Sequence, residues 1–196
     1  MTSIEKVPVT ELVNLHDDLR EPVSQTERNK RQGKYPYFGA TGQVGWINDY
    51  KLDGKFVLLG EDGAPFLDPN KPKAYIVEGK CWVNNHAHVL KGKEGICDDD
   101  YLCFALNWAD YSEVVTGSTR LKLSQSSMSR LLIPKVPFEK QRQIAARLKA
   151  QLVEVATARQ AAQVQVQETN LLRRHMLQAA LDKLVDEPAT LGSANK

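Results

Sequence analysis

The sequence predicts an α+β protein in two parts: a globular domain with many short strands, and one long projecting α-helix that pairs as a coiled coil. All three Trp, all six Tyr and all five Phe fall at or before Phe138, together with 11 of the 12 Gly. Residues 139–184, in contrast, are 46 consecutive residues without Gly, Pro, Trp, Tyr or Phe, and Ala and Gln are frequent among them. Gly and aromatic residues are typical of turns and strands, whereas Ala and Gln favour helices. We therefore predict a globular domain over 1–137, a helix over 138–184 and a flexible tail over 185–196.

The predicted helix carries one row of apolar side chains that recur three or four residues apart. At about 1.5 Å per residue the helix measures roughly 70 Å, whereas a compact domain of the preceding size has a radius of gyration near ~14 Å. The helix therefore extends beyond its own domain, and another surface has to cover the row. We predict that these residues dimerise: Ile144, Leu148, Leu152, Val155, Ala162, Val166, Met176 and Ala180.

A second helix is the surface that the spacing favours. A hairpin would need a turn, and no Gly or Pro interrupts the row. A membrane surface would need a wider apolar face with aromatic anchors, and this row is narrow and rich in Ala. Arg159, Thr169 and Arg173 lie on or near the row and make the coiled coil imperfect. The alternative is a core helix of one larger globule.

The first 47 residues divide into three stretches. Short apolar runs in residues 4–20 predict a strand or a helical turn, and the polar residues 21–34 predict a loop. That loop contains the densest basic cluster of the globular part. Residues 35–47 have Gly at every third position among aromatic residues, which predicts a tight strand–turn–strand. No Gly-Lys-Ser/Thr follows, so we reject a phosphate-binding loop.

The rest of the globular part continues as short elements. Residues 56–64 and 74–90 predict buried strands bounded by turns. Residues 99–106 fit either a strand or the start of a helix. In residues 117–131 we expect a turn, an alternating strand over 119–123, a polar loop over 124–127 and a helical turn over 128–131. The order of the elements indicates α+β rather than repeated βαβ units.

Charge and composition exclude few functions. The net charge is +2, but residues 139–184 carry +4 and the first 138 residues carry −1, so a DNA-binding face requires local clustering. No run of about 18 apolar residues and no secretory signal occur, and we expect a cytoplasmic protein that does not enter a membrane. An odd number of cysteines without framework spacing, Cys81, Cys97 and Cys103, indicates reduced thiols.

No pattern predicts a convincing active site. Cys81, His86, His88 and Cys97 match no standard zinc spacing, and we predict no bound metal. Glu61 and Asp62 form a carboxylate pair between glycines, for which a turn is the commoner role.

A resemblance carries the functional prediction. The phrases YPYFGATGQVG, LLGEDGA and WVNNHAHVL occur in this order and are followed by GST at 117–119, IP at 133–134 and EKQRQI at 139–144. Together they resemble the target-recognition domain of specificity subunits of type I restriction–modification systems, and EKQRQI resembles the start of that family's long spacer helix. The resemblance covers residues 5–184.

The resemblance implies a non-catalytic reader of double-stranded DNA. Family members carry two recognition domains and two antiparallel helices, and each domain reads one half of a bipartite target. Modification subunits dock around them and carry the S-adenosylmethionine chemistry, and the restriction subunit joins through the complex, so we expect no cofactor on this chain. Since this chain has one domain and one helix, it resembles a half-length subunit, and two copies would rebuild the two-fold arrangement.

The DNA-binding candidates are polar and basic side chains on loops, because base edges and phosphates are read by such groups. We predict Arg28, Lys30, Arg31, Lys34, Gln43, Asn84, Asn85, His86, Arg120, Lys122 and Ser126. Asn84, Asn85 and His86 belong to a phrase that the resembling readers of different targets share, so an architectural role is equally open for them.

Two other functions remain as alternatives. One is a small metal-dependent nuclease that uses His86, His88 and the carboxylates Asp98, Asp99 and Asp100. The other is a truncated, inhibitory specificity subunit that dimerises without supporting modification.

Overall fold

The computed structural model describes residues 4–186, with side chains up to Lys183, and confirms the α+β class. The chain divides into two compact units, residues 1–146 and residues 147–196. The globular unit contains eight strands and the short helices, and α5 (Phe138–Asp186) begins in it. Among the described residues, no helix combines the length and the hydropathy that crossing a bilayer requires.

The N-terminal stretch contains both of the elements left open by its sequence. β1 (Lys6–Pro8) leads into α1 (Val9–Leu12), and β2 (Val13–Leu15) leads into the 3-10 turn η1 (Asp17–Leu19). β1 pairs with β8 (Leu132–Pro134) as an antiparallel two-stranded sheet, so the two ends of the globular unit's fold lie side by side.

The prediction of a loop over residues 21–34 was wrong in its middle, where α2 (Gln25–Lys30) forms a short helix. Ser24 is its N-cap, and the Ser24 hydroxyl accepts a hydrogen bond from the Glu27 amide at 3.2 Å. Ser24 and Glu27 have the spacing of a capping box, which begins a helix by satisfying amides that no earlier carbonyl can reach. The polar composition concealed this signal.

A six-stranded sheet forms the body of the globular unit, in the order β2-β7-β5-β6-β3-β4. β3 and β6 are parallel, and the other neighbours are antiparallel. The predicted strand–turn–strand over 35–47 is confirmed as the β3–β4 hairpin. The strands are β3 (Tyr35–Gly39), β4 (Gly42–Ile47), β5 (Leu52–Gly60), β6 (Ala74–Val83) and β7 (Ala87–Gly92).

The single buried strand predicted over 74–90 was wrong, because a turn at residues 84–86 divides it into β6 and β7. Asn84 makes this turn: its side-chain oxygen accepts a hydrogen bond from the His86 amide at 2.8 Å. An Asn side chain that bonds its own backbone two residues on is a turn-forming device.

The segments after β7 resolve the remaining alternatives. Residues 99–108 are helical, as α3 (Asp99–Trp108), and the Asp98 carboxylate caps it by accepting from the Tyr101 amide at 3.0 Å. The strand expected over 119–123 is wrong, because only Lys122 forms isolated bridges there. The polar loop expected at 124–127 is wrong as well, since it is mostly the helical turn α4 (Gln125–Met128).

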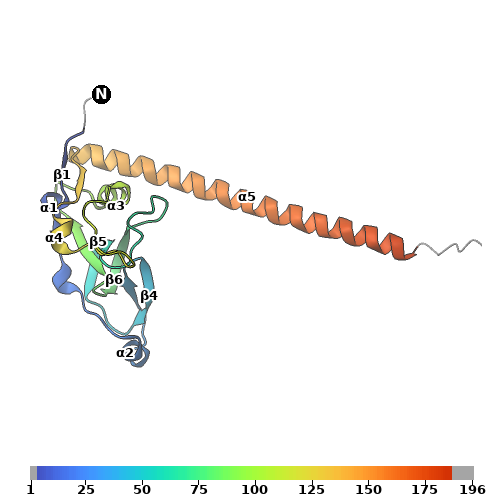
Figure 1. Ribbon diagram of the computed structural model, residues 1–196, viewed down its shortest axis with the longest axis horizontal. Coiled ribbons are helices and arrows are strands. Elements are labelled where there is room, and N and C mark those ends of the chain that lie inside the picture. The colour runs from blue at the N-terminus through green and yellow to red at the C-terminus, as the bar shows by residue number, and fades with distance from the viewer. Residues whose placement is uncertain (1–3, 187–196) are drawn as a thin grey trace, which may run out of the picture. The chain divides into compact units, whose positions relative to one another are not determined.

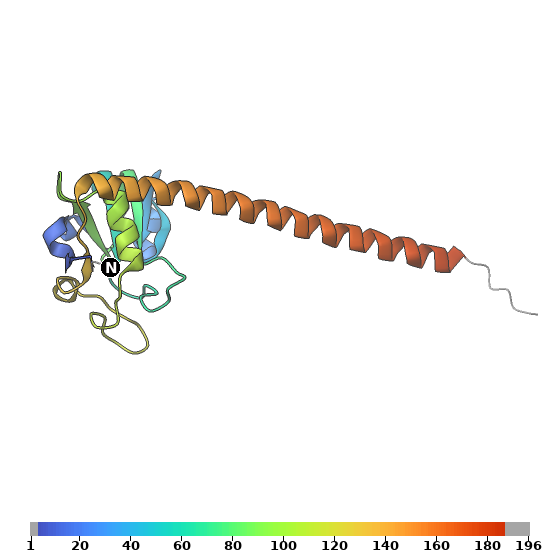
Figure 2. The ribbon, with the colours of Figure 1, turned by 90° about the horizontal axis from the view of Figure 1, so that it is seen from above.

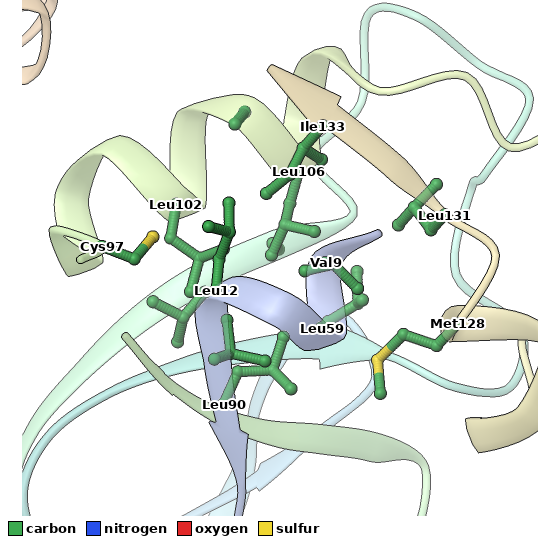
Figure 3. Close-up of a cluster of buried hydrophobic side chains, with 14 of the residues drawn as sticks. Val9, Leu12, Leu59, Leu90, Cys97, Leu102, Leu106, Met128, Leu131 and Ile133 are labelled. Carbon is green, nitrogen blue, oxygen red and sulfur yellow. The ribbon is translucent and has the colours of Figure 1, made fainter. Parts of the chain in front are cut away.

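The main hydrophobic core lies where α1, α3 and the segment around β8 meet one face of the sheet. Figure 3 shows Leu12 of α1, Leu59 and Leu90 of the sheet, and Leu102 and Leu106 of α3 converging. All five side chains are buried. Ala145 belongs to the same core, so the first turns of α5 pack on the globular unit.

The long helix is confirmed, and Figures 1 and 2 show α5 as one unbroken helix. Gln141, in its first turn, is 1% exposed. The Gln141 side chain accepts from the Asp98 amide at 2.9 Å and donates to the carbonyl oxygens of Ile96 and Val136, each at 2.8 Å. Of the predicted flexible tail, Val185 and Asp186 belong to α5, and residues 187–196 lie outside the described part.

Candidate nucleic-acid interface

Two of the predicted DNA-binding arginines are held against aromatic rings. The Arg28 guanidinium lies 4.5 Å from the Tyr37 ring centroid and donates to the Val23 carbonyl oxygen at 2.6 Å. The Arg31 guanidinium lies 5.0 Å from the Trp82 ring centroid. Both arginines are half-buried, and their stacking fixes α2 on the sheet.

The two lysines of the same cluster have the exposure that phosphate contact requires. Lys30 is exposed at the end of α2, and Lys34 is exposed just before β3, with its ammonium 5.5 Å from the Tyr35 ring centroid. A flexible ammonium at the surface is suited to sequence-independent contact with phosphates. The cluster therefore divides into two anchoring arginines and two exposed lysines.

The Asn84–His86 turn brings one buried and two accessible side chains together. Asn84 is buried, and its backbone N–H donates to the Phe38 carbonyl oxygen at 3.0 Å. Asn85 is exposed, and His86 is half-buried with Nδ1 3.5 Å from Asp62 Oδ2. Asn84 thus has an architectural role in the turn, which is the alternative that its place in the shared phrase left open.

Arg120 and Lys122 lie beside the same part of the sheet, because both meet acidic residues that follow β5. Arg120 Nε is 2.6 Å from Asp62 Oδ1, and Lys122 Nζ is 3.4 Å from Glu61 Oε1. His86, Arg120 and Lys122 therefore converge on the Glu61–Asp62 pair. This convergence includes three of the predicted residues, and no local sequence pattern indicates it, because residues 61–62 and 120–122 are far apart along the chain.

The last two predicted residues lie on other elements. Gln43 is exposed on β4, the edge strand of the sheet, and its side-chain amide donates to the Gly45 carbonyl oxygen at 3.1 Å. Ser126 is exposed on α4, with its hydroxyl 3.0 Å from that of Ser124. The side chains of Val44 and Trp46 are also exposed on β4, and the prediction did not include them.

Beneath the Glu61–Asp62 pair lies a buried ionic network around His88. Asp17 Oδ2 is 2.6 Å from His88 Nδ1 and 3.0 Å from an Arg20 guanidinium nitrogen. His88 Nε2 is 2.8 Å from the Leu123 carbonyl oxygen, and Arg20 also pairs with Glu61. Both ring nitrogens of His88 therefore face acceptors. The network links η1, the end of β5, β7 and the segment before α4.

Asp17, Glu61 and His88 are the one group of potential metal ligands found among the described residues. Arg20 lies against both carboxylates and supplies the positive charge that these groups require. In this structure the group therefore forms part of a salt-bridge network.

The constellation proposed for a nuclease does not form among the described residues. His88 is used in the buried network, whereas Asp98 caps α3. Asp99 pairs with Lys91 at 2.6 Å and Asp100 with Lys55 at 2.9 Å. Each carboxylate already has a structural partner, and none of them joins His86 and His88 in a cluster with metal-ligand spacing.

The apolar row on α5 is exposed beyond the globular unit. Ile144 belongs to the globular unit and packs against its main core, whereas Leu148 belongs to the second unit and is half-buried. The remaining predicted dimerisation residues are all exposed: Leu152, Val155, Ala162, Val166, Met176 and Ala180. Six more large apolar side chains of α5 are exposed as well: Val153, Val164, Leu171, Leu172, Leu177 and Leu181. The apolar surface of the helix is thus wider than the predicted row.

Residues 1–162 match the model of the family described as the type I restriction modification DNA specificity domain. The chain belongs to this family. A Haemophilus influenzae protein provisionally named type I restriction enzyme specificity subunit S.HindORF215P is 32% identical to it over 143 residues, which are 73% of this chain and 36% of that protein. The resemblance found in the sequence is therefore confirmed.

Solved type I specificity subunits share the fold. The S subunit from M. genitalium aligns with a TM-score of 0.58 at 17% identity, over 76% of this chain and 40% of that one. The HsdS subunit from Thermoanaerobacter tengcongensis aligns with a TM-score of 0.53 at 16% identity, over 82% and 40%. A chain from a structure that addresses complex assembly and conformational transition of the type I R-M system gives a TM-score of 0.65 at 18% identity, over 93% and 46%. This type I specificity-domain chain thus spans less than half the length of these relatives.

Proposed function

We propose that this chain is the DNA sequence-specificity component of a type I restriction–modification complex, that it has no catalytic activity, and that each copy reads one half-site. The family match over residues 1–162 is the observation that carries the proposal. The placement of exposed basic and polar side chains on α2, on the Asn84–His86 turn and on the segment before α4 supports it.

Two copies of the chain form the functional unit in this proposal. The chain spans 36% of its Haemophilus relative and 40–46% of the solved subunits. It contains one globular unit and one long helix, where the resembling full-length subunits carry two of each. A second copy covers the exposed apolar side chains of α5, which water would otherwise solvate at a free-energy cost.

The partners follow from this assembly. The homodimer binds double-stranded DNA through its globular units and holds modification subunits, which bind S-adenosylmethionine and carry out the methyl transfer. The restriction subunit joins through the modification complex. One of the solved neighbours comes from a study of type I complex assembly, which supports the scaffolding role by analogy.

The dimer is tested by Leu148→Asp with Leu152→Asp. Two carboxylates in an apolar interface lose hydration without gaining a partner, which costs several kcal/mol, so light scattering at micromolar concentration should show a monomer. Ala150→Asp adds one carboxylate about 200° around the helix from both positions and should leave the dimer intact. A monomeric wild type at that concentration would contradict the proposal.

The specificity role is tested by co-expressing the chain with its modification subunit and mapping methylated sites across the host genome. We expect one bipartite, two-fold symmetric motif that disappears when the chain is omitted. Assembly without any methylation would instead favour the truncated, inhibitory subunit. Methylation at the same sites without this chain would exclude it as the specificity component.

A further inference from the structure

Arg120 is an exposed side chain that the fold nevertheless holds in one orientation. Its side chain is 60% exposed, yet its Nε donates to Asp62 Oδ1 at 2.6 Å. Surface ion pairs add little to stability, and ordering a long side chain has an entropic cost. The stability of the fold therefore does not account for this arrangement.

The backbone that carries Arg120 is fixed on both sides. Thr116 and Lys122 exchange two backbone hydrogen bonds, at 2.9 and 2.8 Å, which close a five-residue loop that contains Arg120. Gly117 has a φ of +95°, and a Cβ there would lie 2.4 Å from the Arg120 carbonyl oxygen, so the loop requires glycine. Two more backbone hydrogen bonds attach this loop to the end of β5. The Gly63 amide donates to the Leu121 carbonyl oxygen at 2.9 Å, and the Leu123 amide donates to the Glu61 carbonyl oxygen at 2.8 Å.

The surroundings of the guanidinium are equally specific. Gly63 has a φ of +75°, and a Cβ on it would approach Arg120 Nε to 3.2 Å, so a side chain at this position would press on the guanidinium. The second oxygen of the Asp62 carboxylate lies 3.5 Å from His86 Nδ1. Asp62 thus stands between Arg120 and His86, and it has one oxygen directed at each.

The guanidinium of Arg120 has two terminal nitrogens in addition to Nε. Within the described part of the chain, its ion pair with Asp62 uses Nε, so the two terminal nitrogens remain available. A guanidinium whose Nε is bound to a carboxylate presents these two nitrogens as a planar pair of donors. That pair matches O6 and N7 of guanine in the major groove. A phosphate is a poorer match, because the adjacent Asp62 carboxylate repels it.

We infer that Arg120 reads a guanine in the half-site and that Asp62 is the positioning residue that aims it. This assignment rests on the proposed function, and it names the residues, Arg120 and Asp62, and the base, guanine, that one contact of the half-site involves. It also separates Arg120 from the exposed Lys30 and Lys34, whose flexible ammonium groups we assign to phosphates.

The test uses the complete complex of the chain with its modification subunit, after the wild-type motif has been mapped. Binding is measured to duplexes that carry each of the four bases at each position of the half-site, over a range of salt concentrations. The variants are Arg120→Lys, Arg120→Ala and Asp62→Asn. Asp68→Asn is the matched control, because Asp68 forms an exposed ion pair of 3.5 Å with Lys71.

We expect the wild type to prefer guanine at one position by roughly 10- to 100-fold, the range of a bidentate base contact. Arg120→Lys keeps the charge but loses the planar donor pair, so it should lose most of this preference at that position alone. Asp62→Asn should reduce the preference at the same position and leave the salt dependence unchanged. Asp68→Asn should behave as the wild type.

Two results would overturn the inference while leaving the proposed function intact. The first is full discrimination at every position in Arg120→Lys and Asp62→Asn. The second is an equal loss for all duplexes in Arg120→Ala, with the slope of log K against log salt reduced by about 0.9, which identifies a phosphate contact. A wild-type complex without any site preference would instead refute the proposed function and the inference with it. Thermal unfolding shows whether each variant remains folded.

Discussion

Single buried side chains hold this protein together at points where the backbone leaves donors and acceptors unpaired. Gln141 is the clearest example, since its side-chain amide pairs with the Asp98 amide and the Ile96 carbonyl oxygen of one loop and with the Val136 carbonyl oxygen before α5. The half-buried Asn107 has a similar role, because its side-chain oxygen accepts from the backbone amides of Lys73 and Ala74 at 2.7 and 3.1 Å. Buried polar groups that lose such partners are more costly than the bonds themselves suggest.

Replacing Gln141 with Leu should therefore destabilise the globular unit, because the Asp98 amide and two carbonyl oxygens lose their partners. We expect a loss of about 3 kcal/mol in the free energy of unfolding, from roughly 1–3 kcal/mol for each buried unpaired group after partial relaxation. Urea denaturation followed by far-UV circular dichroism measures it. Gln143→Leu, at an exposed neighbour, is the control, and equal stability of the two variants would contradict the role of Gln141.

The buried thiols predict a dependence of stability on alkaline pH. Burial raises the pKa of the Cys97 thiol from 9.0 to about 12, with a contribution from Asp99 and Asp98, and burial raises that of Cys81 to about 11. Since the folded state holds these protons more tightly, their stabilising effect is complete below pH 9 and is lost as pH rises towards 12.

We therefore expect the melting temperature to fall above pH 9, and to fall less steeply in Cys97→Ala, which lacks one of the two thiols. Thermal unfolding between pH 7 and pH 11 tests this, with each variant compared to its own value at pH 7. An identical fall in wild type and variant would mean that other groups cause the alkaline loss.

At the scale of elements, α2 shows why a basic cluster should not be treated as one unit. Arg28 and Arg31 stack on Tyr37 and Trp82, whereas Lys30 and Lys34 face solvent. Removing all four charges would disturb the packing of α2 and any DNA contact together. The two lysines can be changed without touching the aromatic contacts of the arginines.

Lys30→Ala with Lys34→Ala should weaken DNA binding by the assembled complex equally for all sequences. If each lysine contacts one phosphate, the slope of log K against log salt should fall by about 1.8, since each contact contributes about 0.9. Lys71→Ala with Lys135→Ala removes the same charge from two other exposed positions as a control. An unchanged slope in the Lys30/Lys34 variant would exclude these lysines from the phosphate backbone.

The sequence predicts some elements better than others for identifiable reasons. The β3–β4 hairpin and α5 could be predicted because glycine spacing and uninterrupted helical periodicity are local signals. The turn at Asn84 was missed because apolar residues on both sides continue the strand pattern. Some ion pairs join segments that are distant in sequence, as Arg120 with Asp62 and Arg20 with Glu61 do. Only the folded structure therefore shows which basic side chains are paired with carboxylates and which are exposed.

At the scale of the whole molecule, the long helix should set the distance between two half-sites in the proposed dimer. If two copies of α5 pack antiparallel, their crossing point lies near Ala161, and a heptad inserted there keeps the apolar row in phase. The insertion should separate the domains by roughly 10 Å at 1.5 Å per residue, which corresponds to about three base pairs. It should also rotate the half-sites by roughly 100°, given about 10.5 base pairs per turn.

The expected outcome is either methylation at a motif with a longer central spacer or a loss of methylation caused by the rotation. Both are read by mapping methylated sites in DNA exposed to the mutant complex, with dimerisation of the variant verified by light scattering. Full methylation at the original spacing would show that α5 does not set the distance between the half-sites.

The hydrogen bonds of the Gln141 side chain also determine where this chain can be joined to a related chain in a chimera. In a chimera joined at residue 137, the domain would come from this chain and the whole helix from another. The Asp98 amide would then need a hydrogen-bond partner from whichever residue the other chain has at position 141. A junction after Ala146 instead transfers the globular unit together with Gln141 and the core residue Ala145. The portable module therefore includes the beginning of the helix, and exchange of target specificity between such chains should succeed with junctions inside α5 rather than before it.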